Sequence, residues 1–130
     1  MPSTPHILVV EDDSSLLSAI AAVLENEGYR VSMEADGFTA LDWLHKNEPP
    51  TMILLDLRMP RMNGWAFWAR IRFLKNVARV PVVMISADSG SQERALSVGA
   101  AGFLVKPFTV DELIFKVGQV LRPKISRQDQ

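Results

Sequence analysis

Short apolar runs alternate five times along this chain with segments whose apolar residues recur at helical spacing. Four of the runs are apolar along nearly their whole length, whereas the second, residues 29–35, alternates between apolar and polar residues. Glycine or proline stands near most of the junctions, where strands or helices are expected to end. Such continuously apolar strands are typical of parallel sheets covered by helices on both faces. The chain is therefore predicted to be an α/β protein built from repeated strand–helix units.

The expected strands cover residues 7–10, 29–35, 52–57, 82–85 and 102–105. The expected helices cover residues 14–27, 38–46, 64–74, 92–98 and 110–121. Thr109 is a suitable N-cap for the last of these helices, and Gly28 and Gly99 are suitable residues to follow the first and the fourth. A length of 130 residues suits one domain. Residues 1–122 are expected to form it, and residues 123–130 to be a flexible tail or the start of a linker.

Composition narrows the classes of function. A net charge of −1 provides no general attraction to nucleic acid or to an acidic membrane surface, so neither is expected as a direct partner. The absence of cysteine excludes disulfides, thiolate metal sites and cysteine nucleophiles, and it fits a cytoplasmic location. No stretch is long and apolar enough for a membrane helix, and the first ten residues lack the pattern of a signal peptide.

Carboxylates follow two of the apolar runs. Asp56 ends the run of residues 52–55, and Glu11, Asp12 and Asp13 end the run of residues 7–10. In an open parallel sheet the carboxyl ends of the strands share one edge, so these groups should converge. Like charges so close together require a cation, and clustered carboxylates without cysteine or a nearby histidine favour Mg²⁺.

Two further groups follow the later strands. Ser86 can donate a hydrogen bond to a phosphoryl oxygen, and Lys106 can pair either with such an oxygen or with Asp56. A strand-end aspartate can act as a nucleophile and form an acyl phosphate, for which a metal ion and a lysine would supply the compensating charge. Asp13 has an equally good alternative role, because it could simply cap the following helix.

Other prominent side chains have plainer interpretations. Trp43, Trp65 and Trp68 are expected to be packing residues, with Trp65 close to the acidic edge because it follows Asn63-Gly64. His6 and His45 are expected to lie far apart and to be solvated.

Taken together, these motifs resemble the receiver domain of two-component response regulators, as in CheY-like proteins. The resemblance runs from His6 to Leu121. It is carried by residues 7–13 (ILVVEDD), 54–60 (LLDLRMP) with Asn63-Gly64, 81–87 (PVVMISA), and Gly99-Ala100 leading to 103–108 (FLVKPF). It implies a flavodoxin-like (βα)5 doubly wound parallel sheet of three layers with strand order 2-1-3-4-5.

The resemblance also implies a function for the acidic edge. Asp56 would accept a phosphoryl group from a phosphohistidine on a sensor histidine kinase or a histidine phosphotransfer protein. Asp12, Asp56 and the backbone carbonyl of Arg58 would bind Mg²⁺ directly, and Glu11 would act mostly through water. Mn²⁺ could replace Mg²⁺.

The remaining implied roles concern signal output. Ser86 and Lys106 would hold phosphoryl oxygens, the Lys106-Pro107 bond would be cis, and Phe103 would turn inward as Ser86 moves. A downstream protein would then bind the face made by the fourth helix, fifth strand and fifth helix. Arg58 and Asp88 would tune how readily water attacks the acyl phosphate. The segment of residues 87–99 looks about two residues shorter than is usual in the family, which leaves the start of the fourth helix open.

The expected function is thus a phosphorylation-driven switch rather than a turnover enzyme. It could be a stand-alone regulator or the receiver part of a longer protein with an output domain. A phosphatase of the haloacid-dehalogenase type would need an aspartate where Arg58 stands. A flavodoxin would need a Ser/Thr/Gly-rich loop in place of Glu11-Asp12-Asp13. A degenerate receiver that takes no phosphoryl group is the remaining alternative.

Overall fold

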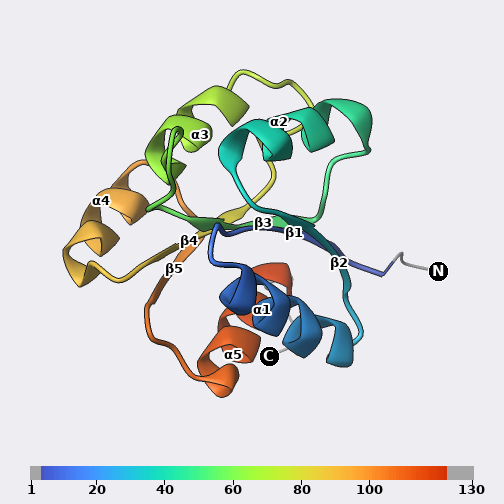
Figure 1. Ribbon diagram of the computed structural model, residues 1–130, viewed down its shortest axis with the longest axis vertical. Helices are drawn as coiled ribbons and strands as arrows, with labels where there is room; N and C mark the ends of the chain where they lie inside the picture. Colours follow the sequence, from blue (N-terminus) through green and yellow to red (C-terminus); the bar gives the residue numbers. More distant parts are fainter. Residues whose placement is uncertain (1–3, 123–130) are drawn as a thin grey trace, which may run out of the picture.

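The computed structural model of the protein, which describes residues 4–122, is drawn in Figure 1. Its strands are β1 (His6–Val10), β2 (Arg30–Glu34), β3 (Met52–Asp56), β4 (Val82–Ser86) and β5 (Gly102–Val105). Its helices are α1 (Ser14–Asn26), α2 (Gly37–Lys46), α3 (Gly64–Ile71), α4 (Gln92–Ser97) and α5 (Val110–Leu121). A short 3₁₀ helix, η1 (Ser89–Ser91), precedes α4.

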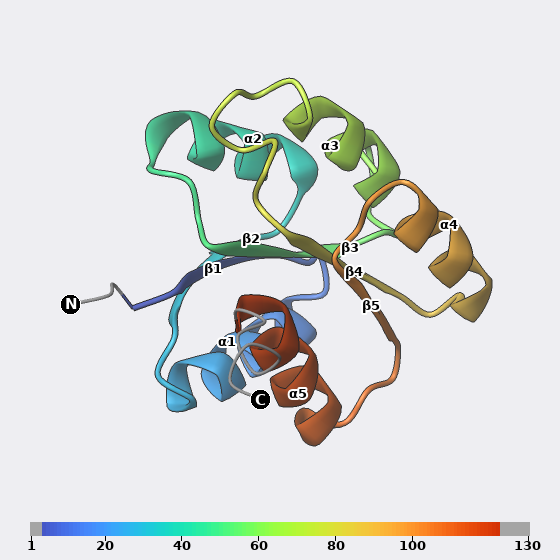
Figure 2. The same ribbon diagram turned by 180° about the vertical axis from the view of Figure 1, so that it is seen from behind.

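The strands form one parallel sheet in the order β2-β1-β3-β4-β5, which confirms the predicted order. Helices α2, α3 and α4 cover one face and helices α1 and α5 cover the other, so the molecule has three layers (Figures 1 and 2). The register sets the ends of the central strands side by side, with Val10 opposite Leu55, Asp56 opposite Ile85, and Ser86 opposite Val105. The residues that follow β1, β3, β4 and β5 therefore meet at one edge.

The pleat of the sheet divides the core in two. Within β1, Leu8 and Val10 pack toward α2 and α3, whereas Ile7 and Val9 pack toward α1 and α5. The same alternation holds in the other buried strands, because successive side chains of a strand point to opposite faces. Burial on both faces explains why these strands are apolar at every position rather than at every second one.

Several boundaries differ from those expected. Helix α3 ends at Ile71 rather than at residue 74, and the chain continues through turns in which Val77 is fully buried against the same core. Helix α5 begins as expected at Val110, and its N-cap Thr109 forms a capping box with Glu112. No helix within residues 4–122 is long and apolar enough to cross a membrane. The tail or linker expected at residues 123–130 lies outside the described residues.

His6 is partly buried rather than fully solvated. Its Nε2 lies 2.7 Å from Ser32 Oγ, and its ring packs edge-on against Trp43 with the centroids 5.4 Å apart. This end of β1 therefore carries a packed histidine that the sequence pattern did not reveal. The site lies at the opposite end of the strands.

Candidate functional site

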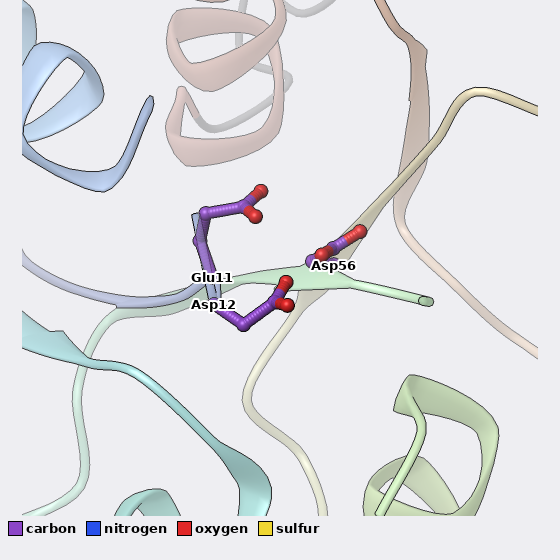
Figure 3. A group of neighbouring side chains, drawn as sticks. All are labelled: Glu11, Asp12 and Asp56. Carbon is purple, nitrogen blue, oxygen red and sulfur yellow. The ribbon is translucent and has the colours of Figure 1, made fainter. Parts of the chain in front are cut away.

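Three carboxylates meet at the carboxyl edge of the sheet. Glu11 and Asp12 follow β1 and Asp56 ends β3, and one carboxylate oxygen from each lies within 4.8 Å of the others (Figure 3). Glu11 and Asp56 are 0% and 1% exposed, whereas Asp12 is exposed. The sequence predicted this convergence, and the paired register of β1 and β3 produces it.

Lys106 supplies the positive charge of the site. Its Nζ lies 3.3 Å from Asp56 Oδ1, to which it donates a hydrogen bond. It also lies 3.1 Å from Glu11 Oε1, an ion-pair distance without hydrogen-bond geometry. The expected cis bond between Lys106 and Pro107 is present. One ammonium thus faces two buried carboxylates, so the negative charge is only partly balanced.

The pKa values reflect this imbalance. Burial, followed by repulsion from Glu11, raises the pKa of Asp56 to about 7, although Lys106 opposes the rise. Burial lowers the pKa of Lys106, but its contacts with Glu11 and Asp56 outweigh that effect and leave this pKa above its ordinary value. A carboxyl group with so high a pKa lacks a sufficient counter-charge.

Oxygen atoms without partners indicate what would complete the site. Asp56 Oδ1 accepts a hydrogen bond from the Arg58 backbone N–H at 3.3 Å, but Asp56 Oδ2 is buried without a hydrogen-bond partner among residues 4–122. A buried carboxylate oxygen of this kind is costly unless a cation or a donor reaches it. Because all the converging groups are oxygen ligands, the arrangement fits a hard divalent cation such as Mg²⁺.

Asp13 does not belong to this cluster. Its Oδ1 accepts hydrogen bonds from the backbone N–H groups of Ser15 and Leu16, at 3.0 and 3.1 Å, so it is the N-cap of α1. Its own N–H donates to Glu11 Oε2 at 3.1 Å. Of the two interpretations left open for Asp13, the structure supports the capping role.

A pocket of about 450 Å³ opens beside the carboxylates. Its lining includes Ser86, Arg58 and Asp88, so the expected switch hydroxyl and the two expected lifetime-tuning residues face one space. Ser86 is 5% exposed and its Oγ accepts a hydrogen bond from the Asp88 N–H at 3.0 Å. Asp88 in turn caps η1, with its Oδ1 2.9 Å from the Gly90 N–H. Asp88 therefore shapes the β4–α4 connection as well as the pocket.

One wall of the pocket contains a contact that sequence reasoning missed. Trp65, at the start of α3, lines the pocket, and the guanidinium of Arg94 from α4 lies 4.0 Å from the centroid of a Trp65 ring. The sequence placed Trp65 near the site, but nothing in it paired this side chain with a residue of α4. The stack joins α3 to α4 at the wall of the pocket.

Phe103 is 6% exposed and lies in the core beneath α2, α3 and α4. It is paired in register with Met84, two residues before Ser86. Phe103 therefore packs inward in this structure, on the face of the sheet that α2, α3 and α4 cover.

Comparison with known proteins identifies the family. The family model described as "Response regulator receiver domain" matches residues 7–118. The chain belongs to the response regulator receiver domain family, whose general features include phosphorylation and Mg²⁺. This membership, together with Arg58 in place of a second aspartate, removes the haloacid-dehalogenase alternative.

Curated relatives are transcriptional regulators. The alkaline phosphatase synthesis transcriptional regulatory protein SphR of Synechococcus elongatus is 36% identical over an alignment of 127 residues, and the match covers 90% of this chain and 49% of SphR. The transcriptional regulatory protein PrrA of Mycobacterium tuberculosis is 37% identical over 122 residues, which are 92% of this chain and 51% of PrrA. The chain thus spans about half the length of these relatives.

Solved structures of receiver domains and related proteins have a similar fold. The chemotaxis protein CheY4 of Vibrio cholerae has 30% identity and a TM-score of 0.84, and the match covers 92% of this chain and 100% of CheY4. The receiver domain of the sensor histidine kinase PA1611 of Pseudomonas aeruginosa has 32% identity and a TM-score of 0.80 over 92% and 98% of the two chains. That structure has a magnesium ion coordinated in its active-site cleft.

Proposed function

We propose that Asp56 is the phosphoacceptor of this receiver domain. The observation that carries the proposal is the buried Asp56 Oδ2, which has no hydrogen-bond partner among the described residues. The same carboxylate contacts Lys106 through Oδ1 and lies close to Glu11 and Asp12. A carboxylate held this way has a free oxygen for attack, and Lys106 supplies part of the counter-charge. The phosphodonor is a phosphohistidine on a sensor histidine kinase or a histidine phosphotransfer protein, in keeping with the two-component family.

The transfer requires the carboxylate form of Asp56. One carboxylate oxygen forms a bond to phosphorus, the P–N bond of the phosphohistidine breaks, and its electron pair remains on the imidazole nitrogen, which takes up a proton. The Lys106 ammonium and the Ser86 hydroxyl are the proposed donors of hydrogen bonds to the oxygens of the transferred group, which the contact of Lys106 with Asp56 and the position of Ser86 at the pocket support.

Asp12, Asp56 and the backbone carbonyl of Arg58 are the proposed direct ligands of Mg²⁺, with Glu11 acting mostly through water. The cation, for which Mn²⁺ can substitute, would neutralise the charge of the carboxylates and of the phosphoryl oxygens. Asp56 Oδ2 without a partner and the raised pKa of Asp56 support this assignment, because both indicate a missing positive charge.

Arg58 and Asp88 are proposed to set the lifetime of the acyl phosphate, since both line the pocket beside the site. Self-catalysed phosphorylation and dephosphorylation would then be the only chemistry of a domain that works as a switch. The output is proposed to pass through Ser86 and Phe103 to the α4–β5–α5 face. Exposed Val105 and Phe115 on that face support protein binding there.

The proposal also covers where the domain works and whether it is part of a longer protein. We place it in the cytoplasm, as a stand-alone regulator or as the receiver part of a longer regulator, acting by protein contact and not touching nucleic acid itself. The transcriptional regulators among its relatives, which are about twice as long, make the longer form the stronger of the two.

The test is phosphorylation by a small donor. The parent protein, Asp56→Asn and Asp13→Asn are incubated with acetyl phosphate and Mg²⁺ and analysed by intact mass. Asp13→Asn is a matched control, because asparagine also caps helices and Asp13 lies outside the cluster. We expect one added phosphoryl group on the parent and on Asp13→Asn, and none on Asp56→Asn.

A parent without an adduct would support the degenerate-receiver alternative and reject the proposal. An adduct of undiminished yield on Asp56→Asn would move the acceptor to another residue. Omitting Mg²⁺ should reduce the yield on the parent strongly, and an equal yield in EDTA would reject the role of the cation.

A further inference from the structure

Arg61, in the loop between β3 and α3, has an unusual backbone conformation. Its φ is +67°, and it is the one non-glycine residue with positive φ among residues 4–122. The Met62 N–H donates to the Pro60 carbonyl at 2.7 Å, which makes a three-residue turn centred on Arg61. A turn of this kind with positive φ is rare and strained for a residue with a side chain. Other contacts must therefore hold the loop in this shape.

The Arg61 side chain supplies two of these contacts. Its Nη2 lies 2.8 Å from Asp36 Oδ2, and its guanidinium lies 5.6 Å from the centroid of the Phe38 ring. Asp36 is the N-cap of α2, with its other oxygen accepting from the Thr39 N–H at 2.8 Å. Arg61 thus ties the tip of the β3–α3 loop to the start of α2. We call the set Arg61, Asp36 and Phe38 the Arg61 clamp.

The loop is also fixed at both of its ends. Next to the clamp, Met62 is 3% exposed and packs so tightly on Gly37 that a Cβ there would lie 2.7 Å from Met62 Sδ. At its base, a Cβ on Gly64 would lie 2.6 Å from the Asp56 carbonyl oxygen. The loop is therefore a short closed bridge between Asp56 and α2, with little freedom to move one part without the rest.

We propose that Arg61 is a positioning residue for the cation site. The loop that it holds carries Arg58, whose carbonyl is a proposed Mg²⁺ ligand, so this inference rests on the proposed function. The start of α2 lies directly after β2, whose Glu34 carbonyl accepts a hydrogen bond from the Glu11 N–H at 3.1 Å. The clamp thus connects the loop after β3 to the segment after β2, and that segment lies beside Glu11 in the loop after β1. The loops after β1 and β3 both contribute residues to the site.

The clamp acts on the geometry of the loop more than on the stability of the fold. The Arg61 side chain is 66% exposed, and an ion pair at such a position contributes little to global stability. The strained turn, in contrast, lies only three residues after Arg58. Loss of the clamp lets the turn relax and moves the Arg58 carbonyl away from the carboxylates.

The test compares Arg61→Ala, Arg61→Gly and Arg61→Lys, with Arg79→Ala as a control at an exposed arginine outside the loop. Mg²⁺ affinity of the unphosphorylated protein is measured by calorimetric titration, and the thermal midpoint is measured in EDTA. We expect Arg61→Ala to raise the Mg²⁺ dissociation constant about fivefold, with a small change in midpoint. Arg61→Gly should recover at least half of that loss, because glycine accepts positive φ without strain.

Arg61→Lys should fall between the parent and Arg61→Ala, and Arg79→Ala should match the parent. Asp36→Asn, which keeps a capping oxygen but loses the ion pair, should weaken Mg²⁺ binding without adding to the effect of Arg61→Ala. The proposal is overturned if Arg61→Gly binds Mg²⁺ as weakly as Arg61→Ala does. If the parent protein binds no Mg²⁺, both the proposed cation site and the role of the clamp are overturned. If Arg61→Ala binds Mg²⁺ as tightly as the parent does, only the role of the clamp is overturned.

Discussion

The Nζ of Lys106 lies 3.3 Å from Oδ1 of Asp56, so the ammonium that follows β5 reaches past the end of β4 to the carboxylate that ends β3. The Lys106 side chain is 24% exposed, and that of Asp56 is 2% exposed. The pair therefore works in a largely dehydrated setting, where the loss of one partner leaves an uncompensated charge. Lys106 stabilises the carboxylate before any phosphoryl group arrives.

Replacing Lys106 tests whether its ammonium is the counter-ion of the buried carboxylates. Lys106→Met leaves Glu11 and Asp56 buried together without the ammonium, and we expect a loss of about 2 kcal/mol in unfolding free energy at pH 8 in EDTA. The pKa of Asp56 should rise further, because Lys106 is the group that opposes its rise. Urea denaturation and carbonyl NMR titration measure the two effects. Lys75→Met, at an exposed lysine, is the control, and equal losses in the two variants would contradict the prediction.

The raised pKa of Asp56 makes the metal-free protein sensitive to pH. The unfolded chain releases this proton near pH 3.8 and the folded protein near pH 7, so between these values the folded state holds more protons. The contribution of Asp56 to stability is fully present below about pH 4 and is lost as pH rises through about 7. The gap between the two pKa values corresponds to at most about 4 kcal/mol.

The difference in unfolding free energy between Asp56→Asn and the parent isolates this contribution, because all other titrating groups are shared. In EDTA we expect Asp56→Asn to gain stability over the parent as pH increases from 5 to 8, by an amount on the order of 2 kcal/mol. A difference that stays constant over this range would show that Asp56 titrates at its ordinary pKa in the folded protein.

Addition of Mg²⁺ should reverse the pH trend. Because the cation competes with the proton on Asp56, its stabilising effect should be larger at pH 8 than at pH 6. At 100 times the dissociation constant the gain is about 2.7 kcal/mol. Thermal unfolding with and without Mg²⁺ measures it, with Asp12→Asn and Asp56→Asn expected to lose most of the gain and Asp13→Asn to keep it. A full gain in Asp12→Asn would place the ion elsewhere.

Much of the site could be predicted because strand ends in a parallel sheet are tied to one edge. Glu11, Asp56 and Lys106 each follow a continuous apolar run, and such a run fixes both the strand and the point at which it stops. Alternation along the strands also explains the contact geometry, since Asp56 continues the side of β3 that carries Leu54, and Lys106 the side of β5 that carries Leu104. A few short, continuous apolar runs were therefore enough to place these groups together.

Contacts between loops and helix surfaces could not be predicted in this way. The Arg61 ion pair with Asp36 joins residues 25 apart in the chain through a turn of positive φ, a conformation that its sequence Pro-Arg-Met does not favour. The stack of Arg94 on Trp65 depends on how α4 packs against α3, although α4 itself begins at residue 92 as expected. Such pairings depend on tertiary packing and leave no periodic pattern of residues in the sequence from which they could be predicted.

The lifetime of the acyl phosphate should depend on Arg58 and Asp88, because both line the pocket at the carboxyl ends of β3 and β4, which Leu57 and Ser86 also line. We expect Arg58→Ala and Asp88→Ala to change the phosphoryl half-life by a larger factor than they change Mg²⁺ affinity. The protein is first phosphorylated with acetyl phosphate, and the excess donor is removed in a buffer without EDTA. The rate at which the protein then releases phosphate gives the half-life. Ser91→Ala, at another residue of the pocket lining, is the comparison.

Asp88 needs one more variant, because its Oδ1 also caps η1 through the Gly90 N–H. Asp88→Asn keeps an oxygen at the cap and removes the charge, whereas Asp88→Ala removes both. If the charge controls the approach of water, the two variants should share one altered half-life. If the cap controls it through the shape of the β4–α4 connection, only Asp88→Ala should differ from the parent. Half-lives equal to that of the parent in Arg58→Ala and both Asp88 variants would remove these residues from the control of dephosphorylation.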